Sequence, residues 1–240
     1  MPDDSELEKA TERWEEAKAR GDTIAQHLAK GFSVGIGIAD PVLGALASLA
    51  TVFIPSRRAK RLEEFAEQIA SDLRALREAI DATYIRSDEF AHIFEQSFRG
   101  VAENYQEEKV AAFRGILVNA PIRRDVSEDE KQYFLSLVSS LTPLHIRLLR
   151  FLDDPAAYAA AAGLSESSID GGFRRFLPVV ISGVRVEVLE SAFADLYQMG
   201  MINTAPSIFT TMTSAGGLQL ARGRVTPLGQ LFVSFITAPR

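Results

Sequence analysis

The residues of this sequence that could support acid–base or metal chemistry are few and far apart. His27, His92 and His145 are its three histidines, and the sequence contains no cysteine. None of the three has a second histidine at the spacing of a metal-binding helix or loop. A metal site or catalytic dyad would need partners from distant parts of the chain. We interpret each histidine as a partly exposed helix residue and expect no metal site.

Two further segments resemble a phosphate-binding loop and a nucleophile elbow, but each lacks residues that the motif requires. The run GIGIAD, from Gly35 to Asp40, lacks the third glycine and the following Lys-Ser/Thr of a phosphate-binding loop. Ser165 and Ser182 lack the flanking glycines of a nucleophile elbow. Acidic residues cluster at 107–108, 125–130 and 153–154. These clusters lie at predicted helix ends, where carboxylates cap helices. We expect no catalytic residues and no cofactor, and so a protein that is not an enzyme.

The composition is that of a globular protein: 240 residues, of which 47% are hydrophobic and 24% are charged. The lack of cysteine excludes disulfides, thiolate zinc sites and a cysteine nucleophile. Residues 1–30 carry charges throughout and show no secretory signal, so a cytoplasmic location is expected. Residues 1–125 hold 17 Lys/Arg against 22 Asp/Glu, and residues 126–240 hold 9 against 10. Neither half has the basic excess that drives non-specific nucleic-acid binding.

An apolar stretch dominates the predicted N-terminal domain, residues 1–125. Residues 32–54 contain Asp40 as their only charge, and the Asp40-Pro41 step predicts two short apolar helices that meet at a corner. Two interpretations remain open. The hairpin is the buried centre of a helical domain, or it is a membrane-active element flanked by headgroup-binding cations. The candidate membrane or anion contacts are Arg57, Arg58, Lys60 and Arg61.

Helical periodicity continues after the apolar hairpin. Apolar residues recur at steps of three and four from residue 57 to 82, which predicts an amphipathic helix of about seven turns. Ser87 or Asp88 is expected to cap a further phenylalanine-rich helix, in which Gly100 would introduce a kink. Another apolar face follows and ends at Asn119. A domain boundary is expected at 121–126.

The order of elements in residues 126–240 predicts a winged-helix-like domain. Ser127 and Glu130 have capping-box spacing, and Thr142-Pro143 starts a second helix. An amphipathic helix over 184–199 precedes a short strand at Met201-Ile202 and a β-hairpin of residues 208–212 and 218–225. Thr226-Pro227 begins the last helix. The expected fold class is therefore mainly α: a helical N-terminal domain followed by a winged-helix-like α+β domain.

Winged-helix domains commonly bind DNA, but the residues here favour a different partner. The helix that would enter the major groove, residues 184–195, has one arginine against three acids. DNA binding stays open through cations that flank this helix or lie in the wing. The candidate nucleic-acid contacts are Arg174, Arg175, Arg222 and Arg224.

Four segments carry a resemblance to a known family: residues 109–119, 134–152, 189–202 and 225–236. Their layout resembles that of bacterial Abi-alpha-type proteins, which are linked to phage abortive infection. The resemblance covers roughly residues 100–237 and rests on apolar and turn positions. It implies a bacterial cytoplasmic protein with a phage-defence role, and it provides no catalytic residues.

The sequence therefore favours an interaction protein that works without catalysis. Its winged-helix-like domain would bind a protein partner, and the hairpin of residues 32–54 would be an effector element or a self-association surface. One alternative is a membrane-active effector that uses this hairpin. A second alternative is a DNA-binding transcriptional regulator.

Overall fold

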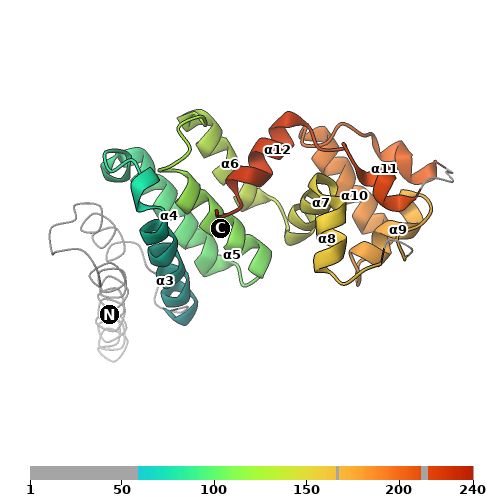
Figure 1. The fold of residues 1–240 in the computed structure, drawn as a ribbon, viewed down its shortest axis with the longest axis horizontal. Coiled ribbons are helices and arrows are strands. Elements are labelled where there is room, and N and C mark those ends of the chain that lie inside the picture. The colour runs from blue at the N-terminus through green and yellow to red at the C-terminus, as the bar shows by residue number, and fades with distance from the viewer. Residues whose placement is uncertain (1–58, 166–167, 212–215, 240) are drawn as a thin grey trace, which may run out of the picture. The chain divides into compact units, whose positions relative to one another are not determined.

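The computed structural model describes residues 59–165, 168–211 and 216–239. Within these ranges the chain is mainly helical and forms ten α-helices, α3 to α12 (Figure 1). It divides into two units. Unit 1 comprises Met1–Ser139 together with Phe235–Arg240, and unit 2 comprises Ser140–Ser234. The predicted mainly α fold is confirmed. The apolar segment 32–54 lies outside the described residues.

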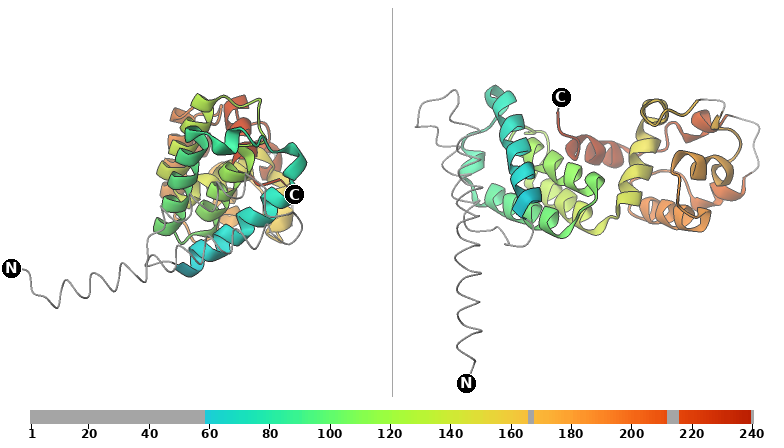
Figure 2. Two further views of the ribbon diagram at one scale, coloured as in Figure 1. Left: turned by 90° about the vertical axis from the view of Figure 1, so that its left-hand side faces the viewer. Right: turned by 90° about the horizontal axis from the view of Figure 1, so that it is seen from below.

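Unit 1 contains four described helices, and three of them pack against one another. α3 (Ala59–Ala75), α4 (Asp88–Glu103) and α5 (Glu107–Asn119) make pairwise contacts, and α6 (Glu128–Ser140) follows in the chain (Figure 1, Figure 2). Their apolar stripes meet in a core of aromatic rings. The rings of Phe94 and Phe98 stack with centroids 4.3 Å apart, and Phe65 of α3 meets Phe98 edge to face at 5.1 Å. The helical periodicity of the sequence thus marks the buried faces.

The first long helix is shorter than predicted. α3 ends at Ala75 rather than at residue 82, and two 3₁₀ turns follow, η2 (Arg77–Ala79) and η3 (Tyr84–Arg86). Interactions at Asp81 hold the chain in a turn within the range predicted as helix. Its backbone N–H donates to the Pro121 carbonyl, and its carboxylate accepts from the N–H groups of Thr83 and Tyr84. These bonds replace helical hydrogen bonds with a turn.

The predicted caps of unit 1 are confirmed. The Ser87 hydroxyl accepts from the Phe90 N–H at 3.2 Å. Ser127 and Glu130 form the reciprocal capping box, with the Ser127 N–H donating to Glu130 at 2.7 Å. Gly100 has a packing role that its sequence does not show. A Cβ at this position would lie 2.2 Å from the Phe113 ring, so glycine allows α4 and α5 to approach closely.

The chain leaves unit 1 at Ser139, whereas the sequence predicts a domain boundary at 121–126. α6 belongs to unit 1 almost to its last residue, because its apolar face packs there. Its Phe134 ring lies 5.5 Å from that of Phe235, which returns to unit 1 from the far end of the chain. Local sequence patterns cannot predict that the C-terminal residues pack in unit 1.

Unit 2 packs short helices around a cluster of phenylalanine rings. Its helices are α7 (Pro143–Asp153), α8 (Pro155–Ala161), α9 (Phe173–Val180), α10 (Val186–Gln198), the 3₁₀ helix η5 (Pro206–Thr210) and α11 (Gly217–Ala221). α12 (Pro227–Phe235) closes the unit and ends in unit 1. Phe173 contacts the rings of Phe176, Phe193 and Phe209 at centroid distances of 4.9, 5.5 and 5.7 Å. These rings fix α9, α10 and η5 around one core.

The predicted β-hairpin of 208–212 and 218–225 is wrong for the described residues. Residues Pro206–Thr210 form η5, and residues Gly217–Ala221 form α11. The only bridges in the described chain are isolated ones, Asp170 to Gly216 and Ile202 to Val225. A proline that opens a 3₁₀ turn explains the first half. In the second half, Leu218 and Ala221 are both buried, a spacing that suits a helix and not a strand. The described structure therefore lacks the β-sheet of an α+β domain.

Candidate functional site

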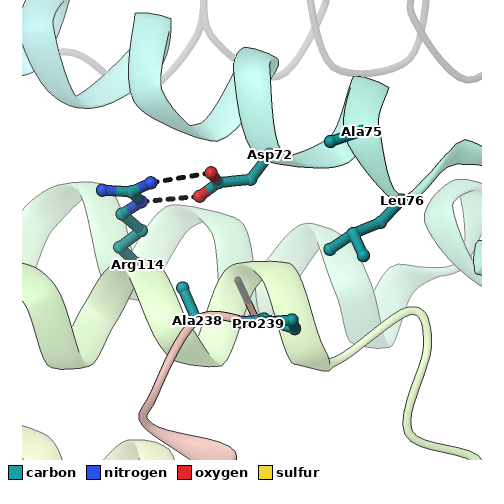
Figure 3. Close-up of a pocket in the computed structure, with 6 residues that line it drawn as sticks. All are labelled: Asp72, Ala75, Leu76, Arg114, Ala238 and Pro239. Carbon is teal, nitrogen blue, oxygen red and sulfur yellow. Dashed lines mark hydrogen bonds and ion pairs between the residues drawn. The ribbon is translucent and has the colours of Figure 1, made fainter.

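A groove on unit 1 is the first candidate for a binding site (Figure 3). It has a volume of about 460 Å³. Three parts of unit 1 line it: the last turn of α3, the middle of α5 and the C-terminal segment after α12. The described lining residues are Asp72, Ala75, Leu76, Arg114, Ala238 and Pro239. A groove of this size could admit a small molecule or a few side chains of a peptide.

An ion pair between Arg114 and Asp72 forms the polar wall of this groove. The Arg114 Nε donates to Asp72 Oδ2 at 2.6 Å, and Nη2 donates to Oδ1 at 2.7 Å, so the two planar groups meet as a fork (Figure 3). A longer bond of 3.4 Å joins Nη1 to the Gln68 amide oxygen. The hydrogen bond from Asp72 raises the pKa of Arg114, with burial acting in the opposite direction. The arginine therefore stays charged and ties α5 to α3.

The lining of the groove suits binding better than catalysis. Each carboxylate oxygen of Asp72 accepts a bond from Arg114, so neither acts as a base without breaking the pair. The other described lining side chains are the apolar Ala75, Leu76, Ala238 and Pro239. They bring neither a nucleophile nor a proton donor to the ion pair.

The outward face of α10 in unit 2 is the second candidate. Three carboxylates lie on this face: Glu187, Glu190 and Asp195. Val188 and Tyr197 flank the face on opposite sides, with 49% and 42% of their surface exposed. α10 packs against α7 and α9 through its other side, where Leu189, Phe193 and Leu196 are buried. The face therefore combines negative charge with two exposed apolar groups.

Neighbouring helices hold the carboxylates of this face in place. Arg174 of α9 pairs with Glu187 at 3.4 Å and with Glu190 at 3.3 Å. His145 of α7 contacts Asp195, with 3.2 Å between Nε2 and Oδ2. His145 Nδ1 accepts the Thr142 N–H, so Nε2 carries the ring proton and donates it to Asp195. These contacts position α10 and leave its surface acidic.

Of the cations proposed as membrane or anion contacts, the structure describes one side chain, that of Arg61. Arg57 and Arg58 lie outside the described residues. Lys60 lies in the first turn of α3, and its side chain is not among those described. Arg61 points back into the fold, where Nη1 donates to the carbonyls of Val101 and Asn104 at 3.1 and 2.8 Å. Arg61 therefore binds the C-terminal end of α4.

The cations proposed as nucleic-acid contacts are mostly engaged within unit 2. Arg174 pairs with α10 as described above, and Arg175 lies 3.9 Å from Asp170. Arg224 donates to the Leu220 carbonyl at 2.7 Å and to the Thr204 hydroxyl at 3.4 Å. Arg222 is exposed. Three of the four proposed arginines therefore make contacts within unit 2, to carboxylates, a carbonyl and a hydroxyl.

Several polar residues with a clear structural role gave no signal in the sequence. Lys109 and Asn119 are each only 3% exposed, and both bind backbone carbonyls in unit 1. Lys131 pairs with Glu128 at 2.6 Å, and its Nζ lies 4.0 Å from the Tyr84 ring centroid. Apart from Glu128, which lies three residues before Lys131, their partners are far away in the chain or are backbone atoms. The Thr142 to His145 spacing is the exception, because it matches a helix cap and could have located that histidine.

The described side chains contain no group of three or more His, Cys, Asp or Glu residues that could hold a metal ion. No helix within the described ranges is long and apolar enough to span a bilayer. No protein family, characterised protein or solved structure matches this chain.

Proposed function

We propose that this chain is an interaction protein, which binds a protein partner through the outward face of α10 in unit 2. The observation that carries the proposal is the composition of this face, with three carboxylates between exposed Val188 and Tyr197. Protein interfaces combine apolar and polar side chains, with aromatic residues enriched, and this face presents both kinds. The face contains no nucleophile that is paired with a base.

The charge of the face determines the kind of partner. α10 itself contains no Lys or Arg, and the single Arg174 serves both Glu187 and Glu190. A protein surface with Lys or Arg around an apolar side chain would complement it.

DNA binding is the weaker alternative on electrostatic grounds. A phosphate backbone would meet the carboxylates of α10, and the arginines nearby already serve ion pairs and carbonyls. A membrane-active role rests on the sequence of residues 32–54 and on Arg57, Arg58 and Lys60. The resemblance to Abi-alpha-type proteins supports a partner in the bacterial cytoplasm and a role in phage defence.

One substitution tests the proposed face directly. Ser191 is exposed on α10 between the carboxylates, and Ser191→Arg adds bulk and the opposite charge there. Ala160→Arg, on the exposed side of α8 in the same unit, is the matched control. The full chain and both variants would be used to capture proteins from a bacterial lysate. A protein that binds the full chain and Ala160→Arg but not Ser191→Arg would then be purified. We expect calorimetry on the purified pair to show affinity reduced about tenfold or more by Ser191→Arg.

The same preparations separate the alternatives. Sedimentation with phosphatidylglycerol vesicles would favour the membrane effector. A duplex DNA mobility shift that falls steeply with salt would favour the regulator. A partner that binds the full chain and both variants equally would contradict the assignment of α10, with circular dichroism showing that the variants are folded.

A further inference from the structure

The chain passes between the two units twice, and each crossing lies at the C-terminal end of a helix. The first crossing is at Ser139 and Ser140, the last residues of α6, and the second is at Ser234 and Phe235, the last residues of α12. The last four carbonyls of a helix have no partner within it. Each crossing therefore presents carbonyl oxygens that must find donors elsewhere.

At the first crossing, the donor is a buried lysine. Lys109, in the first turn of α5, donates from Nζ to the carbonyls of Val138 and Ser139, the latter at 3.0 Å. Only 3% of its surface is exposed, and burial lowers the pKa of its ammonium group. A cation at a helix C-terminus is favoured by the helix dipole.

At the second crossing, the donor is a buried asparagine at the other end of the same helix. Asn119 Nδ2 donates to the carbonyls of Phe235 and Thr237 at 2.8 and 2.9 Å. Between the two donors, Gly115 lies directly against the returning chain. A Cβ there would come within 2.1 Å of the Ile236 carbonyl oxygen. All of these residues belong to unit 1.

We propose that α5 is a clamp that fixes both crossings, so that any hinge motion of unit 2 requires the bonds of Lys109 or Asn119 to break. The two donors are ten residues apart, which is about 15 Å along a helix. The single helix α5 thus sets the distance between the two crossings. Since a buried carbonyl without a donor is costly, the clamp opens rarely and as a discrete step.

Hydrogen exchange read by mass spectrometry tests the contacts. Lys109→Met should speed exchange in the last turn of α6 about tenfold, and Asn119→Leu should do the same around Phe235 to Thr237. Lys131→Met and Asn104→Ala are the matched controls. Lys131 is a buried lysine at the start of α6, and Asn104 Nδ2 binds the Gly100 carbonyl within α4. Lys131→Met should speed exchange throughout unit 1 without a preference for the crossings, and Asn104→Ala should leave exchange at the crossings unchanged.

A distance measurement tests the hinge itself. Because the chain has no cysteine, spin labels can be attached at Glu103→Cys in unit 1 and Ala160→Cys in unit 2, both at exposed positions. The distance distribution should be broader in Lys109→Met and Asn119→Leu than in the parent and the two controls. Folded clamp variants with an unchanged distribution would overturn the proposal.

The parent chain gives a test that needs no clamp variant to fold. The last turn of α6 should exchange as slowly as the middle of that helix. Exchange that is much faster in the last turn of α6 than in the middle of that helix would also overturn the proposal.

Discussion

Unit 1 and unit 2 both have cores of phenylalanine, but they differ in the polar groups they bury. Among the described residues, unit 1 buries Lys109, Asn119, Lys131 and Ser97, whereas unit 2 buries only Thr204 among its polar and charged side chains. The lysines and the asparagine of unit 1 reach carbonyls, a carboxylate or a ring through directed contacts. Unit 1 therefore depends on contacts that a single substitution can break.

Unit 2 is stabilised mainly by rings packed against one another. Phe173, Phe193 and Phe209 form a triangle of contacts with centroids 5.2 to 5.7 Å apart. Phe151 extends the cluster to Phe176 and Tyr158 at 6.1 and 5.7 Å. The ion pairs of Arg174 and Arg175 in this unit lie on its surface. The comparison predicts that unit 2 resists changes of charge and pH and is sensitive to lost ring volume.

The largest effect is expected from Phe173→Ala in unit 2. The ring is fully buried and contacts three other rings, so its removal should cost about 3–5 kcal/mol of unfolding free energy. Hydrogen exchange of the whole protein, read by mass spectrometry for peptides from each unit, should show the loss of protection in α9 and α10. Val179→Ala, at an exposed position of the same helix, is the control. Equal losses in unit 1 would show that the two units unfold together.

A smaller loss is expected from Lys131→Met in unit 1. This change keeps the volume and removes an ammonium group that pairs with Glu128 and lies over the Tyr84 ring. Burial and Glu128 raise the pKa of Tyr84, so its hydroxyl remains a donor to Glu128 at 2.9 Å. We expect a loss of about 2 kcal/mol, measured by urea unfolding. A neutral result would mean that an apolar group serves this site as well as the lysine.

As the pH is lowered, unit 1 should lose stability at a higher pH than unit 2. Backbone hydrogen bonds from Tyr84 and Thr83 lower the pKa of Asp81, and the side chains of Arg123 and Ser127 lower those of Asp125 and Glu130. Such carboxylates stabilise the fold above their ordinary pKa, and the benefit is lost as the pH falls through the lowered value. The loss should begin below about pH 4.5. It should be smaller than the effect of either substitution, because these groups are solvent-exposed.

Among the described residues of unit 2, Asp153 has a pKa that is shifted in the opposite direction. Burial and the nearby Asp154 raise the pKa of Asp153, so its charged form costs stability at neutral pH and acid removes that cost. Hydrogen exchange at pH 7 and pH 3 should therefore show faster opening in α4 to α6 and little change in α9 and α10. Faster opening of unit 2 at pH 3 would contradict the comparison.

The helices could be predicted from the sequence because helix formation depends on local sequence signals. The caps at Ser87 and Ser127 and the Thr142-Pro143 start are confirmed, since capping and periodicity act over a few residues. The wing was mispredicted because the Ser-Ala-Gly-Gly segment at 214–217 suits a hairpin, whereas its apolar neighbours pack as helices. Local turn chemistry did not reveal which side chains would be buried.

The candidate sites could be predicted only in part. The acidic character of α10 was visible in the sequence, because it depends on composition alone. The pairing of Asp72 with Arg114, 42 residues apart, and of Asn119 with Phe235 and Thr237 depends on tertiary packing. A fork-shaped ion pair or a buried side-chain amide leaves no periodic signal in a single sequence.

The smallest effect is expected from Arg174→Ala, although this arginine makes two ion pairs. Arg174 and Glu187 are mostly exposed, and their N to O distances of 3.3 and 3.4 Å are at the long end for a bonded pair. Exposed pairs of this kind contribute about 0–0.5 kcal/mol, and salt screens them further. We expect a change within that range by urea unfolding, at most about a quarter of that for Lys131→Met. A larger loss would mean that surface charge fixes α9 against α10, and that unit 2 also depends on directed contacts.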